Sequence, residues 1–296
     1  MSKDRNFHVV TDTSANLPTA QAKERDIVVM PFSYIVDGKA YACTDTAAFD
    51  AEGYYAMLAS GVRVTTSQVT PQQFVEEFEP LLEDGDVIYL SMASGISGTY
   101  GSACMAARQL MEKYPARKVC VIDTKGASLG TGLIALFAAD LRDQGMATDK
   151  AVTRLEHDVQ CMCNIFTVDN LMYLRRTGRI SNLTAALGSV LNIKPLLKGN
   201  DEAKIVSFAK VRGRKQAIRA LAERYDKLVV DPENQVIGIA QSACKEDADY
   251  LESLLRQNRP PKAILQVEYE PVTGSHTGPG ALALFFRGDE HVRKAN

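Results

Sequence analysis

The chain repeats one local pattern, in which a short apolar run is followed by a loop rich in Ser, Thr, Gly and Asp and then by a helical stretch. The clearest copy has its apolar run at residues 86–90 and its loop at residues 91–98. Apolar residues then recur at helical spacing from Tyr100 to Tyr114. Because strands that alternate with helices form parallel sheets covered by helices, the pattern predicts an α/β fold.

The polar loops of this pattern predict where a ligand binds. Similar loops follow the apolar runs at residues 7–10 and 118–122, near Asp12 and Asp123. In a parallel sheet, the loops beyond the carboxyl ends of the strands form the binding crevice. We therefore expect these loops and the one that holds Ser97 to lie at the same edge of a sheet.

Ser97, with Gly98 behind it, is a candidate N-cap for the helix that follows. Such a loop directs free backbone N–H groups and hydroxyls at one point, and that point favours an anion. An ordinary capped turn explains the same residues, and this loop alone does not decide between the two.

Two further polar segments strengthen the prediction of an anion site. Thr66 and Ser67 lie in a second predicted polar loop, at residues 65–68, just before a helix whose start is marked by capping-box spacing at residues 70–73. His276 and Thr277 lie in a predicted glycine-rich loop. Hydrogen bonds from such groups to a charged partner are worth roughly 1.5–3 kcal/mol each. Three separated groups of this kind favour a site for one carboxylate head group.

The second half of the chain has a different texture. Residues 193–209 predict a hairpin, residues 236–267 a strand–helix–strand unit, and residues 281–286 a last buried strand. An earlier hairpin is expected at residues 34–41, turned at Asp37 and Gly38. We expect two domains, an N-terminal parallel-sheet α/β domain at residues 1–160 and a C-terminal α+β domain at residues 161–296.

Composition narrows the class of protein. The chain has 296 residues, 46% of them hydrophobic, and a formal net charge of −2, which gives no indication of nucleic-acid binding. No apolar run is long enough to span a membrane, and the N-terminus lacks a signal-peptide segment. The six cysteines show no zinc-type spacing. We expect a cytoplasmic protein with reduced thiols, no metal and no cofactor.

Three other classes of function remain open from the residues alone. A serine hydrolase or acyltransferase would use Ser94 or Ser97 with His276 as base, although the G-x-S-x-G elbow is missing. A nucleotide site would need a P-loop or a G-x-G-x-x-G motif, and neither occurs. A metal enzyme is weakly indicated, because the other histidines among the four have ordinary surroundings. The acyl hydrolase or transferase is the main alternative to a binding protein.

Six segments, taken together and in order, resemble those of the DegV family of bacterial fatty-acid-binding proteins. They are residues 11–18, 66–68, 94–100, 123–128, 173–181 and 276–280. The resemblance runs from Phe7 to Phe286, which is nearly the whole chain. The best-known members of that family are the lipid-binding subunits of a two-part fatty acid kinase.

The resemblance implies a long-chain fatty acid bound between the two domains. Its carboxylate would be held by Thr66 and Ser97, with His276 close by, and the adjacent Ser67, Gly98 and Thr277 would complete the site. A separate kinase would phosphorylate that carboxylate, so the chain itself would have no catalytic activity. The family usually has Pro and Ser where this chain has Val69 and Thr70. Because of that departure, the preferred acyl-chain length stays open. The hydroxyl of Thr66 is still present for the head group.

Two basic clusters in the second half predict where a kinase would dock. The first contains Arg175, Arg176 and Arg179. The second contains Lys210, Arg212, Arg214 and Lys215. A local positive patch can attract an acidic partner surface and speed encounter. Two solvated basic faces are the alternative interpretation.

Overall fold

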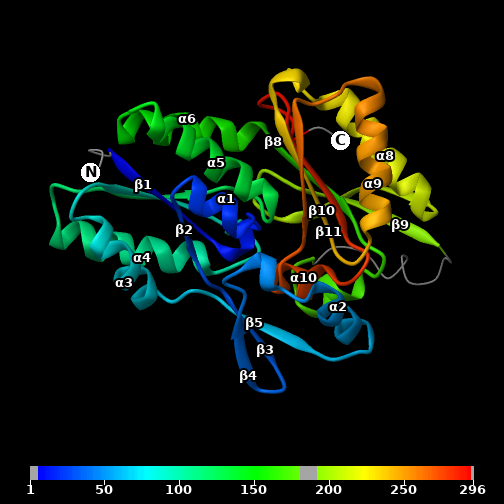
Figure 1. Ribbon diagram of the computed structural model, residues 1–296, viewed down its shortest axis with the longest axis horizontal. Coiled ribbons are helices and arrows are strands. Elements are labelled where there is room, and N and C mark those ends of the chain that lie inside the picture. Colours follow the sequence, from blue (N-terminus) through cyan, green and yellow to red (C-terminus); the bar gives the residue numbers. More distant parts are fainter. Residues whose placement is uncertain (1–5, 181–191, 295–296) are drawn as a thin grey trace.

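The computed structural model describes residues 6–180 and 192–294 and confirms the α/β fold (Figure 1). Ser181, the last residue of the basic segment expected after residue 171, lies outside the described residues. Among the residues described, no helix is both long and apolar enough to cross a membrane.

A four-stranded sheet organises the first half of the chain. Its order is β2-β1-β6-β7, and every neighbouring pair is parallel, as the repeated pattern predicted. The strands are β1 (Phe7–Asp12), β2 (Ile27–Met30), β6 (Asp86–Ser91) and β7 (Val119–Asp123). The loops after β1, β6 and β7 therefore meet at one edge, as expected.

Alternation along the strands separates the two faces of this sheet. Val10 and Tyr89 point to one face and pack with Phe74 and Phe78. The helices on that face are α3 (Pro71–Leu81) and α4 (Thr99–Lys113). The other face packs against apolar side chains of α1 (Thr19–Glu24), α5 (Leu129–Asp143) and α6 (Thr148–Cys161). Two faces buried by helices explain why consecutive residues of these strands are apolar, as at residues 9–10, 27–30 and 87–90.

A six-stranded mixed sheet, in the order β10-β9-β8-β13-β11-β12, organises the second half. Only β11 and β12 pair in parallel, and the remaining pairs are antiparallel. The strands are β8 (Met162–Thr167), β9 (Ile193–Gly199), β10 (Ile205–Arg212), β11 (Val236–Gln241), β12 (Ala263–Glu268) and β13 (Leu282–Arg287). Helices α8 (Arg214–Leu228) and α9 (Lys245–Asn258) pack on the face that carries Leu284 and Phe286.

Helix α5 lies between the two large sheets and contacts both β1 and β11 (Figure 1). Because it is covered on both sides, its residues 129–139 carry no charged side chain, and the charged residues are confined to its last turn. One continuous hydrophobic cluster joins Leu90 and Leu129 to Leu197 and Phe285 across the two halves of the chain. The division into domains at residue 160 stays a prediction, since this core is shared.

A third, three-stranded antiparallel sheet of β3 (Ser33–Val36), β4 (Lys39–Ala42) and β5 (Val64–Ser67) projects from the molecule (Figure 1). Its β3–β4 hairpin confirms the turn expected at Asp37 and Gly38, both of which have positive φ. Helix α2 (Ala51–Ala59) follows β4 in the chain.

Two short helices, α7 (Met172–Arg176) and α10 (Pro271–Thr277), complete the fold and pack against each other. The prediction of a glycine-rich loop from residue 274 was wrong for its first part, because His276 and Thr277 form the last turn of α10. The helix begins here because Glu270 caps its N-terminus. The Glu270 carboxylate accepts hydrogen bonds from the N–H groups of Val272 and Thr273.

Candidate ligand-binding site

A cavity of about 400 Å³ lies where the two halves of the chain meet. Its volume falls within the range of sites for small molecules. Each residue that the sequence analysis assigned to the head-group site lines this cavity. They are Thr66, Ser67, Ser97, Gly98, His276 and Thr277.

Thr66 and His276 form the centre of the polar end. Thr66 lies in β5, not in a loop as expected, and pairs with Tyr34 of β3. Its Oγ1 lies 3.0 Å from Nε2 of His276 on α10. Because side chains alternate along a strand, the neighbouring Thr65 points away and is exposed.

Ser97 lies in the turn between β6 and α4. The expectation that it is the N-cap was wrong by one residue, because Gly98 holds that position. Ser97 still supports the helix start, since its Oγ accepts a hydrogen bond from the N–H of Thr99 at 3.3 Å. A Cβ at Gly98 would collide with the side-chain amide of Gln68, so glycine allows this close approach. The N-terminus of the 15-residue helix α4 thus borders the cavity.

Burial and nearby arginines keep His276 neutral. Desolvation, followed by the positive charges of Arg179 and Arg176, lowers the pKa of His276 to about 4. Its Nδ1 is buried and has no hydrogen-bond partner among the described residues. The site therefore holds a neutral imidazole with hydrogen-bonding capacity left over.

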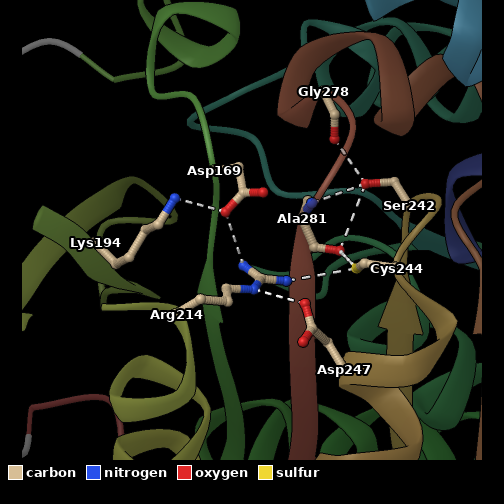
Figure 2. Close-up of polar contacts among 8 residues, drawn as sticks. All are labelled: Asp169, Lys194, Arg214, Ser242, Cys244, Asp247, Gly278 and Ala281. Atoms are coloured by element: carbon tan, nitrogen blue, oxygen red, sulfur yellow. Dashed lines mark hydrogen bonds and ion pairs between the residues drawn. The ribbon is translucent and has the colours of Figure 1, made fainter. Parts of the chain in front are cut away.

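Both ends of α10 are fixed, which positions His276. Glu270 caps the N-terminal end. At the other end, Ser242 Oγ donates to the carbonyl of Gly278 at 2.6 Å and accepts from the N–H of Ala281 at 3.0 Å (Figure 2). Ser242 is fully buried, so this pair of bonds holds the exit from α10 without competition from water.

Three cationic side chains line the cavity, those of Lys125, Arg179 and Lys204, and no described Asp or Glu does. The guanidinium of Arg179 donates to the carbonyls of Ile96 and Thr177 and makes no described contact with a carboxylate. Lys204 Nζ forms an ion pair with Glu202 at 2.8 Å. Arg179 brings positive charge to the polar end, where it lowers the pKa of His276 and favours an anionic ligand.

The remaining wall of the cavity is mainly apolar. It contains aromatic and aliphatic side chains from both halves of the chain, among them Phe32, Met92, Phe166, Leu174, Val272 and Phe285. The cavity therefore has polar and cationic side chains in one region and apolar side chains elsewhere. Such a cavity suits a ligand with a charged head group and a long hydrocarbon chain.

The basic side chains of the two clusters lie in different surroundings in the structure. Arg175 and Arg176 are exposed on α7, whereas Arg179, which was grouped with them, lines the cavity. In the second cluster, Arg214 is half-buried and its Nε donates to Asp247 at 2.8 Å (Figure 2). It also contacts Asp169 and the thiol of Cys244, so it belongs to an internal polar network.

The geometry for a serine nucleophile is missing among the described residues. Ser94 Oγ donates to Asp123 Oδ2 at 2.5 Å, and Ser97 bonds with Thr99. His276 Nε2 pairs with Thr66, and within residues 6–180 and 192–294 no carboxylate orients the other ring nitrogen. A serine hydrolase needs the serine paired with its base and the base held by a third group. The described part of the chain also holds no group of three or more potential metal ligands.

Sequence reasoning missed Asn164 and Lys125 as lining residues. Lys125 lies in the loop after β7, which the repeated pattern had marked as a binding edge, so the loop position was the available signal. Asn164 stands alone in an apolar strand, and nothing in its local sequence distinguishes it from a solvated or capping residue.

Comparison with known proteins agrees with this fold. A family profile described as "Uncharacterised protein, DegV family" matches residues 6–289. A DegV domain-containing protein of Clostridium perfringens is 39% identical over 286 residues, which cover 96% of this chain and 98% of that protein.

Solved structures of similar proteins cover almost the whole chain. A fatty acid binding DegV family protein from Streptococcus agalactiae has a TM-score of 0.84 and 30% identity, covering 96% of this chain and 99% of that one. A DegV family protein from Thermus thermophilus, described by its fatty acid binding, has a TM-score of 0.86 and 28% identity with the same coverage. Profile, sequence and structure agree over the full length of the described fold, and the chain belongs to the DegV family.

Proposed function

We propose that this protein binds a long-chain fatty acid, with the carboxylate at Thr66, Ser97 and His276 and the acyl chain along the apolar wall of the cavity. The observation that carries the proposal is that these hydroxyls and the imidazole line the same cavity as a mainly apolar wall. No described acidic side chain lines that cavity. The fatty-acid-binding relatives support the same ligand class.

The energetics are favourable for such a ligand. Each buried methylene contributes about 0.8 kcal/mol, from which the cost of association is subtracted. Desolvation of the carboxylate is offset by hydrogen bonds worth roughly 1.5–3 kcal/mol each. The hydroxyls of Thr66 and Ser97 supply two of those donors, with the Nε2–H of neutral His276 donating to Thr66 Oγ1 so that the Thr66 hydroxyl can donate to the carboxylate. Ser67, Gly98 and Thr277 line the same cavity. Arg179 adds a favourable charge.

We further propose that the bound carboxylate is presented to a separate kinase in the cytoplasm, which converts it to an acyl phosphate. The sequence has no P-loop to hold ATP, so the phosphoryl donor would come from the partner. The exposed Arg175 and Arg176 on α7 lie beside α10, the helix that carries His276, and form the docking surface in this scheme.

The ligand proposal is tested by competition against a fluorescent fatty acid. Stearic acid should displace the probe, whereas methyl stearate should compete about tenfold less well or worse, because the ester lacks the charge that the hydrogen bonds and Arg179 recognise. Equal competition by acid and ester would show that the cavity does not recognise a carboxylate. Failure of every acyl ligand to bind would refute the proposed function as a whole.

A further inference from the structure

The cavity wall contains a polar side chain, that of Asn164, whose role the carboxylate site does not explain. Asn164 lies in β8, is 7% exposed and lines the cavity together with Phe166 and Phe285. Its Oδ1 is buried and has no hydrogen-bond partner among the described residues. Its Nδ2 has two N–H groups and one described acceptor, the carbonyl of Met162, at the long distance of 3.4 Å.

The surrounding backbone leaves space for this amide. A Cβ at Gly130 of α5 would collide with Asn164 Oδ1, and a Cβ at Gly126 would come within 3.1 Å of it. Two glycines from different segments therefore make room for one side chain. A buried amide oxygen without a donor costs on the order of 1–3 kcal/mol, whereas an apolar residue of the same shape would avoid that cost.

The amide and the centre of the head-group site lie on different elements, Asn164 on β8 and the pair of Thr66 and His276 on β5 and α10. Asn164 and Phe166 face the cavity from the same side of β8, and the strand ends at Thr167. With a rise of about 3.3 Å per residue, Asn164 lies roughly 10 Å before that end. The chain beyond β8 leads to α7, which packs against α10 and His276. With the carboxylate at Thr66 and His276 as proposed, the amide would face the body of the acyl chain.

We infer that Asn164 recognises a hydroxyl group on the acyl chain, so that this protein selects long-chain hydroxy fatty acids over unsubstituted ones. The inference rests on the proposed fatty-acid function. An alcohol is the group that fits, because it donates its O–H to Oδ1 and accepts an N–H from Nδ2. A ketone or a double bond has no donor for the oxygen. The torsion that turns a terminal amide is broad, so the group can align with a ligand hydroxyl.

The chain offers a matched control on the same strand. Thr167 is fully buried, and its Oγ1 also has no described hydrogen-bond partner, but it does not line the cavity. Substituting Thr167→Val removes an unpartnered buried polar atom from β8 without changing the cavity wall. An effect that follows only from removing an unpartnered buried polar atom will therefore appear in Thr167→Val as well as in a variant that removes the amide of Asn164.

The test measures dissociation constants for stearic acid and for monohydroxystearic acids with the hydroxyl beside the carboxyl, at mid-chain or near the methyl end. The wild-type protein should bind at least one mid-chain or distal isomer about tenfold more tightly than stearic acid, the gain expected from pairing a buried amide. Asn164→Leu should reverse that preference, and Thr167→Val should keep it. If the leucine variant does not fold, Asn164→Ala takes its place in the test, because the alanine side chain is too short to collide with Gly130.

The outcomes separate this inference from the proposed function. Tight binding of stearic acid with no gain from any hydroxyl would overturn the role of Asn164 and leave fatty-acid binding intact, since a trapped water would then satisfy the amide. A hydroxyl preference that survives in both Asn164 variants would also overturn it. If neither stearic acid nor its hydroxy derivatives bind, the proposed function itself fails.

Discussion

Thr65 and Thr66 are adjacent in β5 but face opposite sides of it, which makes them a matched pair of residues. Thr66 lines the cavity beside His276, while Thr65 is exposed. Both have the same strand propensity and the same hydroxyl. A difference between their valine variants therefore reports on the cavity and not on the strand.

We predict that Thr66→Val weakens fatty-acid binding by about 1–3 kcal/mol, because one carboxylate oxygen loses its donor. Ser97→Ala should weaken binding by a similar amount, and the two effects should not simply add, since both groups act on one head group. Thr65→Val is the control and should bind as the wild type does. Competition titration gives each affinity. Wild-type affinity in the Thr66→Val, Ser97→Ala double variant would contradict this site.

The fate of single residues shows where the sequence is informative. Thr66, Ser97 and His276 could be selected because hydroxyls and imidazole in polar segments at strand ends suit an anion. Arg179 could not be distinguished from its neighbours Arg175 and Arg176, because a basic stretch does not reveal which side chain turns inward. That direction depends on contacts with Ile96, which is distant in the chain.

Among the secondary-structure elements, α10 matters most for the site because it carries His276. Its N-cap, Glu270, is 2% exposed, and burial raises the pKa of its carboxyl to about 7. Buried Asp12 nearby has a pKa raised to about 6, also by burial. Both carboxyls hold protons more tightly in the folded state than their ordinary values would allow.

We predict that Glu270 makes the protein less stable as the pH rises from 4.5, the ordinary pKa of a glutamate, to about 7, its pKa in the folded protein. In this window the folded state binds more protons than the unfolded state, so the free energy of unfolding falls with pH, by up to roughly 3 kcal/mol for this group. Urea denaturation of the wild type and Glu270→Gln across the window measures it. The difference between the two should change with pH, because glutamine does not titrate. Parallel curves would contradict the prediction.

Elements with strong local signals were predictable, and those set by tertiary contacts were not. The capping box of α3 is present, with Thr70 and Gln73 each bonding the other's backbone. The segment around Gly274 was predicted as a loop because of its glycines. In the structure, Gly274 lies within α10, and a Cβ there would collide with the hydroxyl of Tyr55. A glycine can be needed for close packing or for a loop conformation, and the sequence alone does not show which of the two applies at Gly274.

At the scale of the whole molecule, the repeated strand–loop–helix pattern was enough to predict the parallel sheet. The mixed sheet and the position of α5 between the two sheets were not predictable, because they depend on pairing between strands far apart in the chain, such as β8 with β13. The cavity exists only because the two halves pack together.

We predict that charge reversal at Arg175 and Arg176 separates lipid binding from presentation. With ATP, a fatty acid and the cognate kinase, the Arg175→Glu, Arg176→Glu variant should form acyl phosphate about tenfold more slowly, because an acidic partner surface would be repelled. Its affinity for fatty acid should fall less than that rate, by about threefold, because the exposed Arg176 adds a solvent-screened positive charge near His276 while Arg179 stays in place.

The matched control for this prediction reverses the same charge at Lys227 and Lys262, two exposed lysines on other elements of the second half. That variant should form acyl phosphate at the wild-type rate. Equal rates in both variants would contradict docking at α7. Acyl phosphate formed without the kinase would show that the protein has catalytic activity of its own.

Fatty-acid binding itself is tested most directly by analysing what the purified protein carries. Denaturing extraction followed by mass spectrometry should recover a long-chain fatty acid, because an acyl chain in the cavity gains about 0.8 kcal/mol per methylene and is held at its carboxylate. The Thr66→Val, Ser97→Ala variant should retain less. Repeated extraction that finds no fatty acid, together with no uptake of added lipid, would contradict the proposal.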